Sequence, residues 1–84
     1  MAQATPEPTP NPNAMKFQLD RALDGTINVS AAGDAPDDFT RTVLEVEGVA
    51  SVFGVNDFVT VTKTPEAGWD AIVEAVRTAA REHL

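Results

Sequence analysis

The sequence predicts an α+β domain of element order ββαββα. It is expected to be a two-layer sandwich with both helices on one face of a four-stranded, mainly antiparallel sheet. Residues 48–63 contain two runs rich in Val, Phe and Thr around a Gly-Val-Asn-Asp cluster, which is typical of a β-hairpin. Residues 14–20 and 26–30 alternate between apolar and polar side chains, as half-buried strands do. Two segments that start near Pro36 and Pro65 carry apolar side chains at helical spacing. Because both helices need the same apolar surface, we expect the other sheet face to be open to solvent or to a partner.

Length, composition and charge restrict the class of protein. The chain has 84 residues and is 43% hydrophobic, which suits one small globular domain. The sequence contains no cysteine, so this chain has no disulfide, thiolate metal site or thiolate-held iron–sulfur cluster. A net charge of −7 with six Lys and Arg residues argues against binding to nucleic acid or to anionic membranes. Without a spanning apolar run or a signal peptide, we expect a cytoplasmic protein, and we expect it to be a monomer.

The N-terminal segment is rich in proline. Four of the six prolines occupy positions 6, 8, 10 and 12. Proline lacks a backbone donor and favours extended backbone, so we expect residues 1–8 to be a disordered tail and residues 9–84 to form the domain. The Asn side chains within residues 9–13 can bond nearby backbone, which leaves open an ordered segment that lies against the domain.

The expected hairpins assign side chains to the two sheet faces. Residues 14–20 and 26–30 are expected to pair around Asp24-Gly25, with the apolar side chains of both strands turned inward. A loop at residues 54–57 would pair Phe53 with Phe58, and a loop two residues shorter would keep the same faces. The face under the helices is expected to hold Ala50, Val52, Val59 and Val61. The open face is expected to hold Val49, Ser51, Phe53, Phe58, Thr60 and Thr62.

Both helices have recognisable start signals. The first is expected to have Pro36 at its first position and Gly48 just past its end, with Asp37 and Asp38 at the positive end of the helix dipole. The second is expected to have Thr64 as its cap, with Pro65 just inside. Its apolar stripe consists of Trp69, Ile72, Val73, Val76 and Ala80, and we expect the Trp69 ring to be buried against the sheet.

Three separated motifs occur along the chain: T-P-N-P-N-A-M-K-F at 9–17, E-G-V-A-S-V-F-G at 47–54 and D-F-V-T-V-T-K at 57–63. With Trp69 and the closing E-H-L, they resemble the amino-terminal domain of Nfu, the NifU-like iron–sulfur scaffold proteins. The resemblance covers nearly all of the chain after residue 8, and three motifs in the right order make it specific.

In that family this domain precedes a second one, whose C-x-x-C motif holds the iron–sulfur cluster. The chain contains neither that domain nor its cysteines. The resemblance therefore implies a stand-alone, non-enzymatic accessory domain without a cofactor. It would dock protein partners, such as iron–sulfur assembly factors or apo-proteins. One alternative is a small-molecule-binding domain or small enzyme of unknown reaction, which would need a concave pocket with convergent polar groups. Another is that the chain is part of a longer protein, or acts in trans with a separate C-x-x-C domain.

The candidate site residues belong to partner binding. Two aromatic side chains on an open sheet face would form an apolar patch of the kind that marks docking sites, and Lys16 and Lys63 are expected near that surface. We predict that the partner-binding set is Asn11, Asn13, Phe53, Phe58, Thr60 and Lys63.

No catalytic or metal-binding residue is predicted. His83 lies beside the end of the chain, where a general base would lack a positioned partner. Asp34, Asp37 and Asp38 lack the ligand pattern of a calcium loop, and are better explained by the charge preference of a helix N-terminus.

Overall fold

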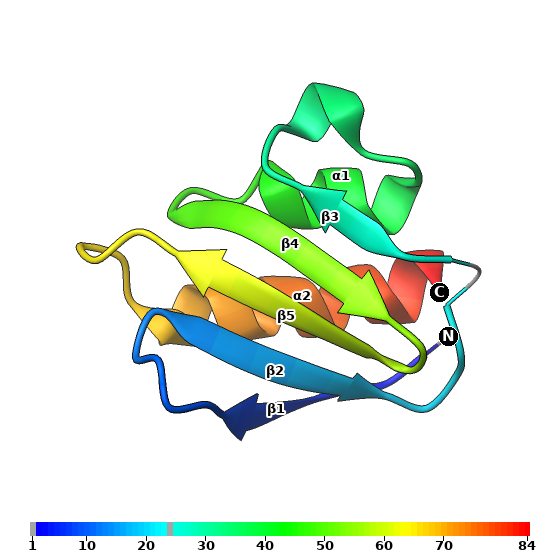
Figure 1. The fold of residues 1–84 in the computed structure, drawn as a ribbon, viewed down its shortest axis with the longest axis horizontal. Coiled ribbons are helices and arrows are strands. Elements are labelled where there is room, and N and C mark those ends of the chain that lie inside the picture. The colour runs from blue at the N-terminus through cyan, green and yellow to red at the C-terminus, as the bar shows by residue number, and fades with distance from the viewer. Residues whose placement is uncertain (1, 24) are drawn as a thin grey trace.

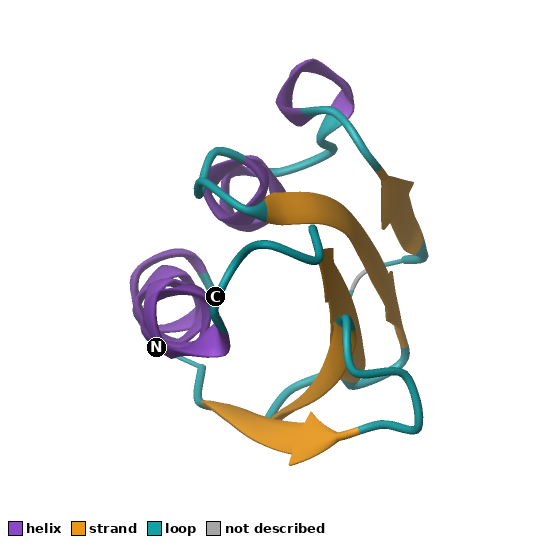
Figure 2. Cartoon of the chain, turned by 90° about the vertical axis from the view of Figure 1, so that its left-hand side faces the viewer, coloured by secondary structure: helices purple, strands orange, loops and turns teal. Residues whose placement is uncertain are grey.

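The computed structural model describes residues 2–23 and 25–84. The elements in chain order are β1 (Ala4–Pro8), β2 (Ala14–Leu19), β3 (Ile27–Val29), the short 3₁₀ helix η1 (Ala32–Asp34), α1 (Asp38–Leu44), β4 (Val49–Val55), β5 (Phe58–Lys63) and α2 (Trp69–His83). The strands form one antiparallel sheet of order β1-β2-β5-β4-β3 (Figure 1). Figure 2 shows α1 and α2 on the same side of this curved sheet. The predicted α+β two-layer sandwich is confirmed, with five strands instead of four.

The fifth strand comes from the proline-rich N-terminal segment. β1 pairs with β2 from Ala4 opposite Leu19 to Pro8 opposite Met15, and the side chain of Ala4 is buried in the core. The prediction of a disordered tail over residues 1–8 is therefore wrong for β1, and Met1 lies outside the described residues. Prolines are tolerated because β1 is an edge strand. On the free side of an edge strand, a backbone nitrogen without a hydrogen breaks no hydrogen bond of the sheet.

The expected hairpin between β2 and β3 does not form. The β4–β5 hairpin lies between them, so β2 pairs with β5 and β3 pairs with β4. The connection from β2 to β3 instead crosses the turn of that hairpin. Leu19 N donates to Asp57 O at 2.8 Å, and Leu23 N donates to Asn56 O at 2.6 Å. The predicted turn at Asp24-Gly25 lies partly outside the described residues, because Asp24 is not among them.

The β4–β5 hairpin has a two-residue loop at Asn56-Asp57, which is the shorter of the two loops that keep the predicted faces. Asn56 has a φ of +57°, in the left-handed region that Asn tolerates better than most residues. The predicted inward residues Val52, Val59 and Val61 are fully buried.

An irregularity between Val49 and Ser51 changes the faces at the start of β4. Val49 lies opposite Lys63 and Ser51 lies opposite Thr62, so Ala50 is an extra residue without a partner in this register. The prediction is consequently wrong for two residues: Ala50 is exposed and Val49 packs against the core. A bulge of this kind shifts the alternation by one residue, which the spacing of apolar residues alone does not reveal.

The first helix is shorter than predicted. Asp37 is its N-cap, and its carboxylate accepts a hydrogen bond from Thr40 N at 2.7 Å. Pro36 therefore precedes the cap and is not the first helical residue. The helix ends at Leu44, so Gly48 belongs to the following turn, where its φ of +96° needs glycine.

The second helix starts later than predicted. Its N-cap is Gly68, while Thr64 to Ala67 form a separate turn in which Ala67 N donates to Thr64 O at 3.1 Å. The Trp69 ring is only partly buried, which corrects the expectation of full burial against the sheet. The buried side chains of this helix are Ile72, Val76, Ala79 and Ala80.

Candidate functional site

The sheet face opposite the helices is the face turned toward the viewer in Figure 1. Strand register brings two rows of side chains onto it. One row crosses all five strands through Glu7, Lys16, Thr60, Phe53 and Asn28. The next row contains Thr5, Gln18, Phe58 and Val55. We call these nine residues the open sheet face.

Phe53 is the centre of the open sheet face. Among the described residues it is the one large hydrophobic side chain that is exposed, with 42% of its surface accessible. It lies directly opposite Thr60, and Phe58 occupies the diagonal position beside it. The structure therefore brings together three predicted partner-binding residues: Phe53, Phe58 and Thr60.

The second aromatic ring of this face is covered in part by a cation. Lys16 Nζ lies 4.7 Å from the centroid of the Phe58 ring, which is within the range of a cation–π interaction. On the same strand as Lys16, Gln18 Nε2 donates to Asp57 O at 2.9 Å. Phe58 is accordingly half-buried, whereas Phe53 presents the uncovered ring.

The predicted residues Asn11 and Asn13 lie elsewhere, in the turn before β2. Asn13 N donates to Asn11 Oδ1 at 2.9 Å, and Ala14 N donates to Asn11 O at 3.1 Å. Trp69 Nε1 donates to Pro12 O at 3.0 Å, which attaches this turn to the start of α2. Residues 9–13, whose order the sequence left open, are thus ordered against the domain. We call residues 9–13 with Lys63 and Trp69 the turn corner.

The position of Lys63 corrects the prediction that it lies near the open face. It follows Val59 and Val61 in the alternation of β5 and points to the helix side, where it is only 8% exposed. Its Nζ donates to Asn13 Oδ1 at 3.2 Å and to Thr64 O at 3.3 Å, and it lies 5.7 Å from the centroid of the Trp69 ring. These contacts fix the turn corner, so Lys63 is a structural cation there and not a surface charge.

The residues considered for catalysis and metal binding have local partners. His83 is exposed, with Nε2 3.4 Å from the Thr42 hydroxyl. Asp37 caps α1 and Asp38 pairs with Arg41. Among residues 2–23 and 25–84, no group of three or more His, Cys, Asp or Glu side chains is arranged to hold a metal ion. A chain without cysteine also does not fit an iron–sulfur cluster, whose usual ligands are thiolates.

Surface clefts also lie on other parts of the molecule. One of about 490 Å³ lies between β1 and α2 and includes Arg77 and Arg81. Another of about 420 Å³ is lined by Glu47 and Gly48, by the turn that precedes α2 and by the start of that helix. The first cleft was not predictable from the sequence pattern, because the segment that forms one wall was expected to be disordered. In the part of the chain that the structure describes, no helix is long and apolar enough to span a membrane.

Comparison with protein families gives a match over almost the whole chain. The family described as scaffold protein Nfu/NifU N terminal matches residues 4–84. Conserved virulence factor C of Staphylococcus aureus is 31% identical over 75 residues, which cover 87% of this chain and 20% of that protein. Conserved virulence factor C of Staphylococcus saprophyticus is 39% identical over 72 residues, which cover 83% of this chain and 19% of that protein. The chain therefore spans about a fifth of the length of these relatives.

Solved structures have the same fold. The crystal structure of protein SAV1430 from Staphylococcus aureus superposes with a TM-score of 0.82 at 31% identity, covering 92% of this chain and 96% of that one. The solution structure of SeR13 from Staphylococcus epidermidis gives a TM-score of 0.64 at 29% identity, with 92% of each chain covered.

Proposed function

This chain belongs to the scaffold protein Nfu/NifU N-terminal family, and on that basis we propose that it is a protein-docking module of iron–sulfur cluster assembly without catalytic activity of its own. The partner is a protein that carries or receives the cluster: a C-x-x-C scaffold domain, in the same protein or in trans, or an apo-protein. We place this role in the cytoplasm.

The observation that carries the proposal is the exposed ring of Phe53 at the centre of the open sheet face. Full burial of a Phe side chain contributes about 1.5–3 kcal/mol. Because 42% of the Phe53 surface is exposed, a partner that covers this ring gains roughly 1 kcal/mol from it. Aromatic residues are enriched in the cores of protein interfaces. The polar side chains around Phe53, such as Thr60 and Asn28, suit the rim of such an interface.

The charges of the open sheet face suit a partner with an acidic group near its apolar contact. Lys16 lies in the same row as Phe53, and its ammonium already stacks on the Phe58 ring. A carboxylate on the partner could pair with this ammonium while a neighbouring apolar side chain covers Phe53. Glu7 at the far end of the row would repel a second acidic group.

NMR titration tests this proposal. The ¹⁵N-labelled chain is titrated with the C-x-x-C domain of an Nfu-type scaffold and, separately, with an apo-protein that accepts clusters. We expect saturable shifts of the Phe53, Phe58 and Thr60 amides with at least one of them. Phe53→Ser should weaken that binding by about fivefold or more, since roughly 1 kcal/mol of ring burial is lost and about 1.4 kcal/mol corresponds to tenfold in affinity.

The control variant is Ala71→Ser, which places the same hydroxyl on an exposed residue of α2. Both variants should keep the wild-type melting temperature within about 4 °C, because neither side chain belongs to the buried core. Equal binding by Phe53→Ser and wild type, or shifts confined to the helices, would reject the open sheet face as the docking site. Absence of shifts with both partner classes would reject the docking function.

A further inference from the structure

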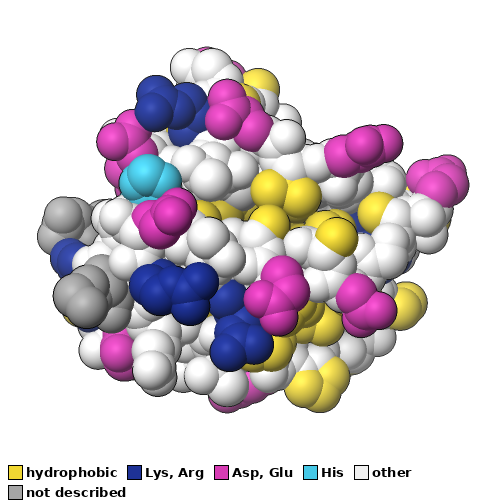
Figure 3. Space-filling model, turned by 180° about the vertical axis from the view of Figure 1, so that it is seen from behind, with side chains coloured by type: hydrophobic (Ala, Val, Ile, Leu, Met, Phe, Trp, Pro, Cys, Tyr) yellow, Lys and Arg dark blue, Asp and Glu magenta, His cyan; other side chains and the backbone are white. Residues whose placement is uncertain are grey.

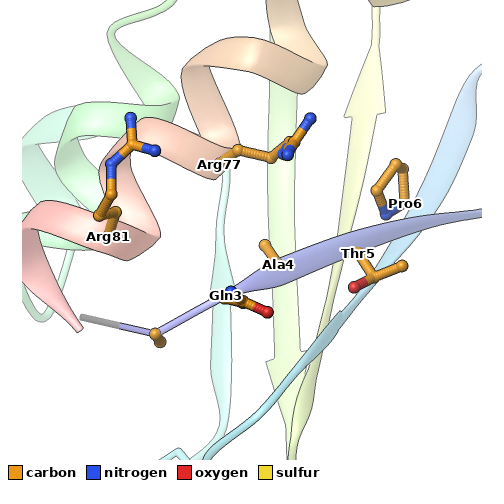
Figure 4. A pocket seen from close by; sticks show the side chains of 7 residues that line it. Gln3, Ala4, Thr5, Pro6, Arg77 and Arg81 are labelled. Atoms are coloured by element: carbon orange, nitrogen blue, oxygen red, sulfur yellow. The ribbon is translucent and has the colours of Figure 1, made fainter.

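A cleft lies between β1 and α2, apart from Phe53 and the centre of the open sheet face. Its walls are formed by residues 2–6 on one side and by Arg77 and Arg81 on the other. Figure 4 shows Arg77 extending from α2 toward Pro6, with Arg81 one helical turn further along. The two arginines are at i and i+4, so they are neighbours on one helix face with side chains roughly 6 Å apart.

These arginines form a local basic area on an acidic molecule. The chain has six Lys and Arg residues and a net charge of −7, and two of the six line this one cleft. The other four are engaged elsewhere: Lys16 on Phe58, Arg21 with Leu84 O, Arg41 with Asp38, and Lys63 in the turn corner. On the helix-covered side of the molecule, Figure 3 shows two neighbouring Lys or Arg side chains with Asp and Glu side chains around them.

Neither arginine is held firmly by the protein itself. Arg77 approaches Glu74 at 3.8 Å, with side-chain exposures of 55% and 73%. An exposed pair of that length contributes little stability. Among the described residues, Arg81 takes part in no ion pair. Both guanidinium groups are therefore available to a carboxylate ligand, which guanidinium binds in a planar, bidentate geometry.

We propose that this cleft binds an extended acidic peptide segment, with carboxylates on alternate residues that pair with Arg77 and Arg81. Alternate side chains of an extended peptide lie on one side of it and are about 7 Å apart, close to the spacing of two helix residues at i and i+4. The exposed ring of Pro6 would contact the small side chains between the carboxylates.

The other ligand classes fit this cleft less well. Nucleic acid carries a charge about every 1.7 Å, so its phosphates would extend beyond two arginines into the acidic surroundings. Addition of a peptide strand to the free edge of β1 is disfavoured because Pro6 and Pro8 lack backbone donors. Pairing must therefore come from the side chains in the cleft.

The test is a titration of the ¹⁵N-labelled chain with a capped peptide of alternating glutamate and alanine. The matched control peptide has glutamine in place of each glutamate. We expect saturable shifts of the Arg77 and Arg81 Nε–Hε signals and of the backbone amides in residues 3–5, with a Kd of about 0.1–1 mM. Binding should be lost at about 1 M salt, where the Debye length is about 3 Å.

The double variant Arg77→Gln/Arg81→Gln should bind at least about tenfold more weakly. Arg41→Gln, which makes an exposed change of one charge on α1, should bind as the wild type does. Phe53→Ser should also bind the peptide normally, so failure of the peptide proposal can be told apart from failure of the proposed function.

Equal binding of the glutamine peptide, or an unaffected double variant, would overturn the proposal. Two further results would do the same: displacement of the peptide by equimolar inorganic phosphate would assign a general anion site, and peptide-free shifts that grow with protein concentration would assign the cleft to a second copy.

Discussion

The hydroxyl of Thr40 is buried in α1 and has no hydrogen-bond partner among the described residues. A buried polar group without a partner carries its full desolvation penalty. Thr40→Val replaces this hydroxyl by a methyl group of similar shape, so we expect the free energy of unfolding to rise by about 1 kcal/mol, measured by urea denaturation. Thr40→Ser keeps the hydroxyl, removes the methyl and should destabilise by about 1 kcal/mol. A valine variant less stable than wild type would contradict this account.

Lys63 is the opposite case, because its buried ammonium has two acceptors. Asn13→Ala removes one of them, and a hydrogen bond to a charged group contributes about 1.5–3 kcal/mol. We expect this variant to lose about 2 kcal/mol of stability. In the double variant Asn13→Ala/Lys63→Met, the loss should be smaller than the sum of the two single losses, since the ammonium that lost its Asn13 acceptor is itself gone. Strictly additive losses would show that the two side chains are not coupled.

Among the elements, the turn that joins α1 to β4 depends on Gly48. Its φ is +96°, and a Cβ at this position would come within 2.6 Å of the Ala67 Cβ. Gly48→Ala therefore combines an unfavourable backbone conformation with a collision against the turn that precedes α2. We expect a loss of about 3 kcal/mol in urea denaturation.

Gly33 provides the matched control for that substitution. A Cβ at Gly33 would meet nothing within 4 Å. Gly33→Ala should change the stability by less than about 0.5 kcal/mol. Similar effects at both glycines would mean that the backbone of the α1–β4 turn is not constrained as the structure shows.

For the molecule as a whole, β1 is the strand at one edge of the sheet and forms a wall of the cleft that contains Arg77 and Arg81. Deletion of residues 1–8 removes the strand that covers β2 and takes Ala2 and Ala4 out of the core. We expect the free energy of unfolding to decrease, and the melting temperature to fall by about 4–8 °C for each kcal/mol of that decrease. The newly exposed edge of β2 should promote association, visible as concentration-dependent sedimentation. Glu7→Ala, an exposed change within β1, should have neither effect, and a deletion variant with wild-type stability would contradict the strand assignment.

The candidate site was predictable in part. Phe53, Phe58 and Thr60 share a face because alternation along β4 and β5 assigns them to it, and the central hairpin is local in sequence. The inward direction of Lys63 follows from the same alternation, but its charge favoured a surface position. Its burial is tolerated because two acceptors meet the ammonium: the neighbouring Thr64 O and the side chain of Asn13, which is 50 residues away in the chain.

The sequence by itself determined the fold class and the side chains that face the core, including Phe17, Val59, Val61, Ile72 and Val76. Periodicity is a property of neighbouring residues, so it needs no knowledge of the fold. The tertiary structure alone decided the strand order, the recruitment of the proline-rich segment as β1 and the cleft beside Arg77 and Arg81. Proline spacing predicts extended backbone but does not say what an extended segment pairs with, because pairing depends on contacts between residues distant in the chain.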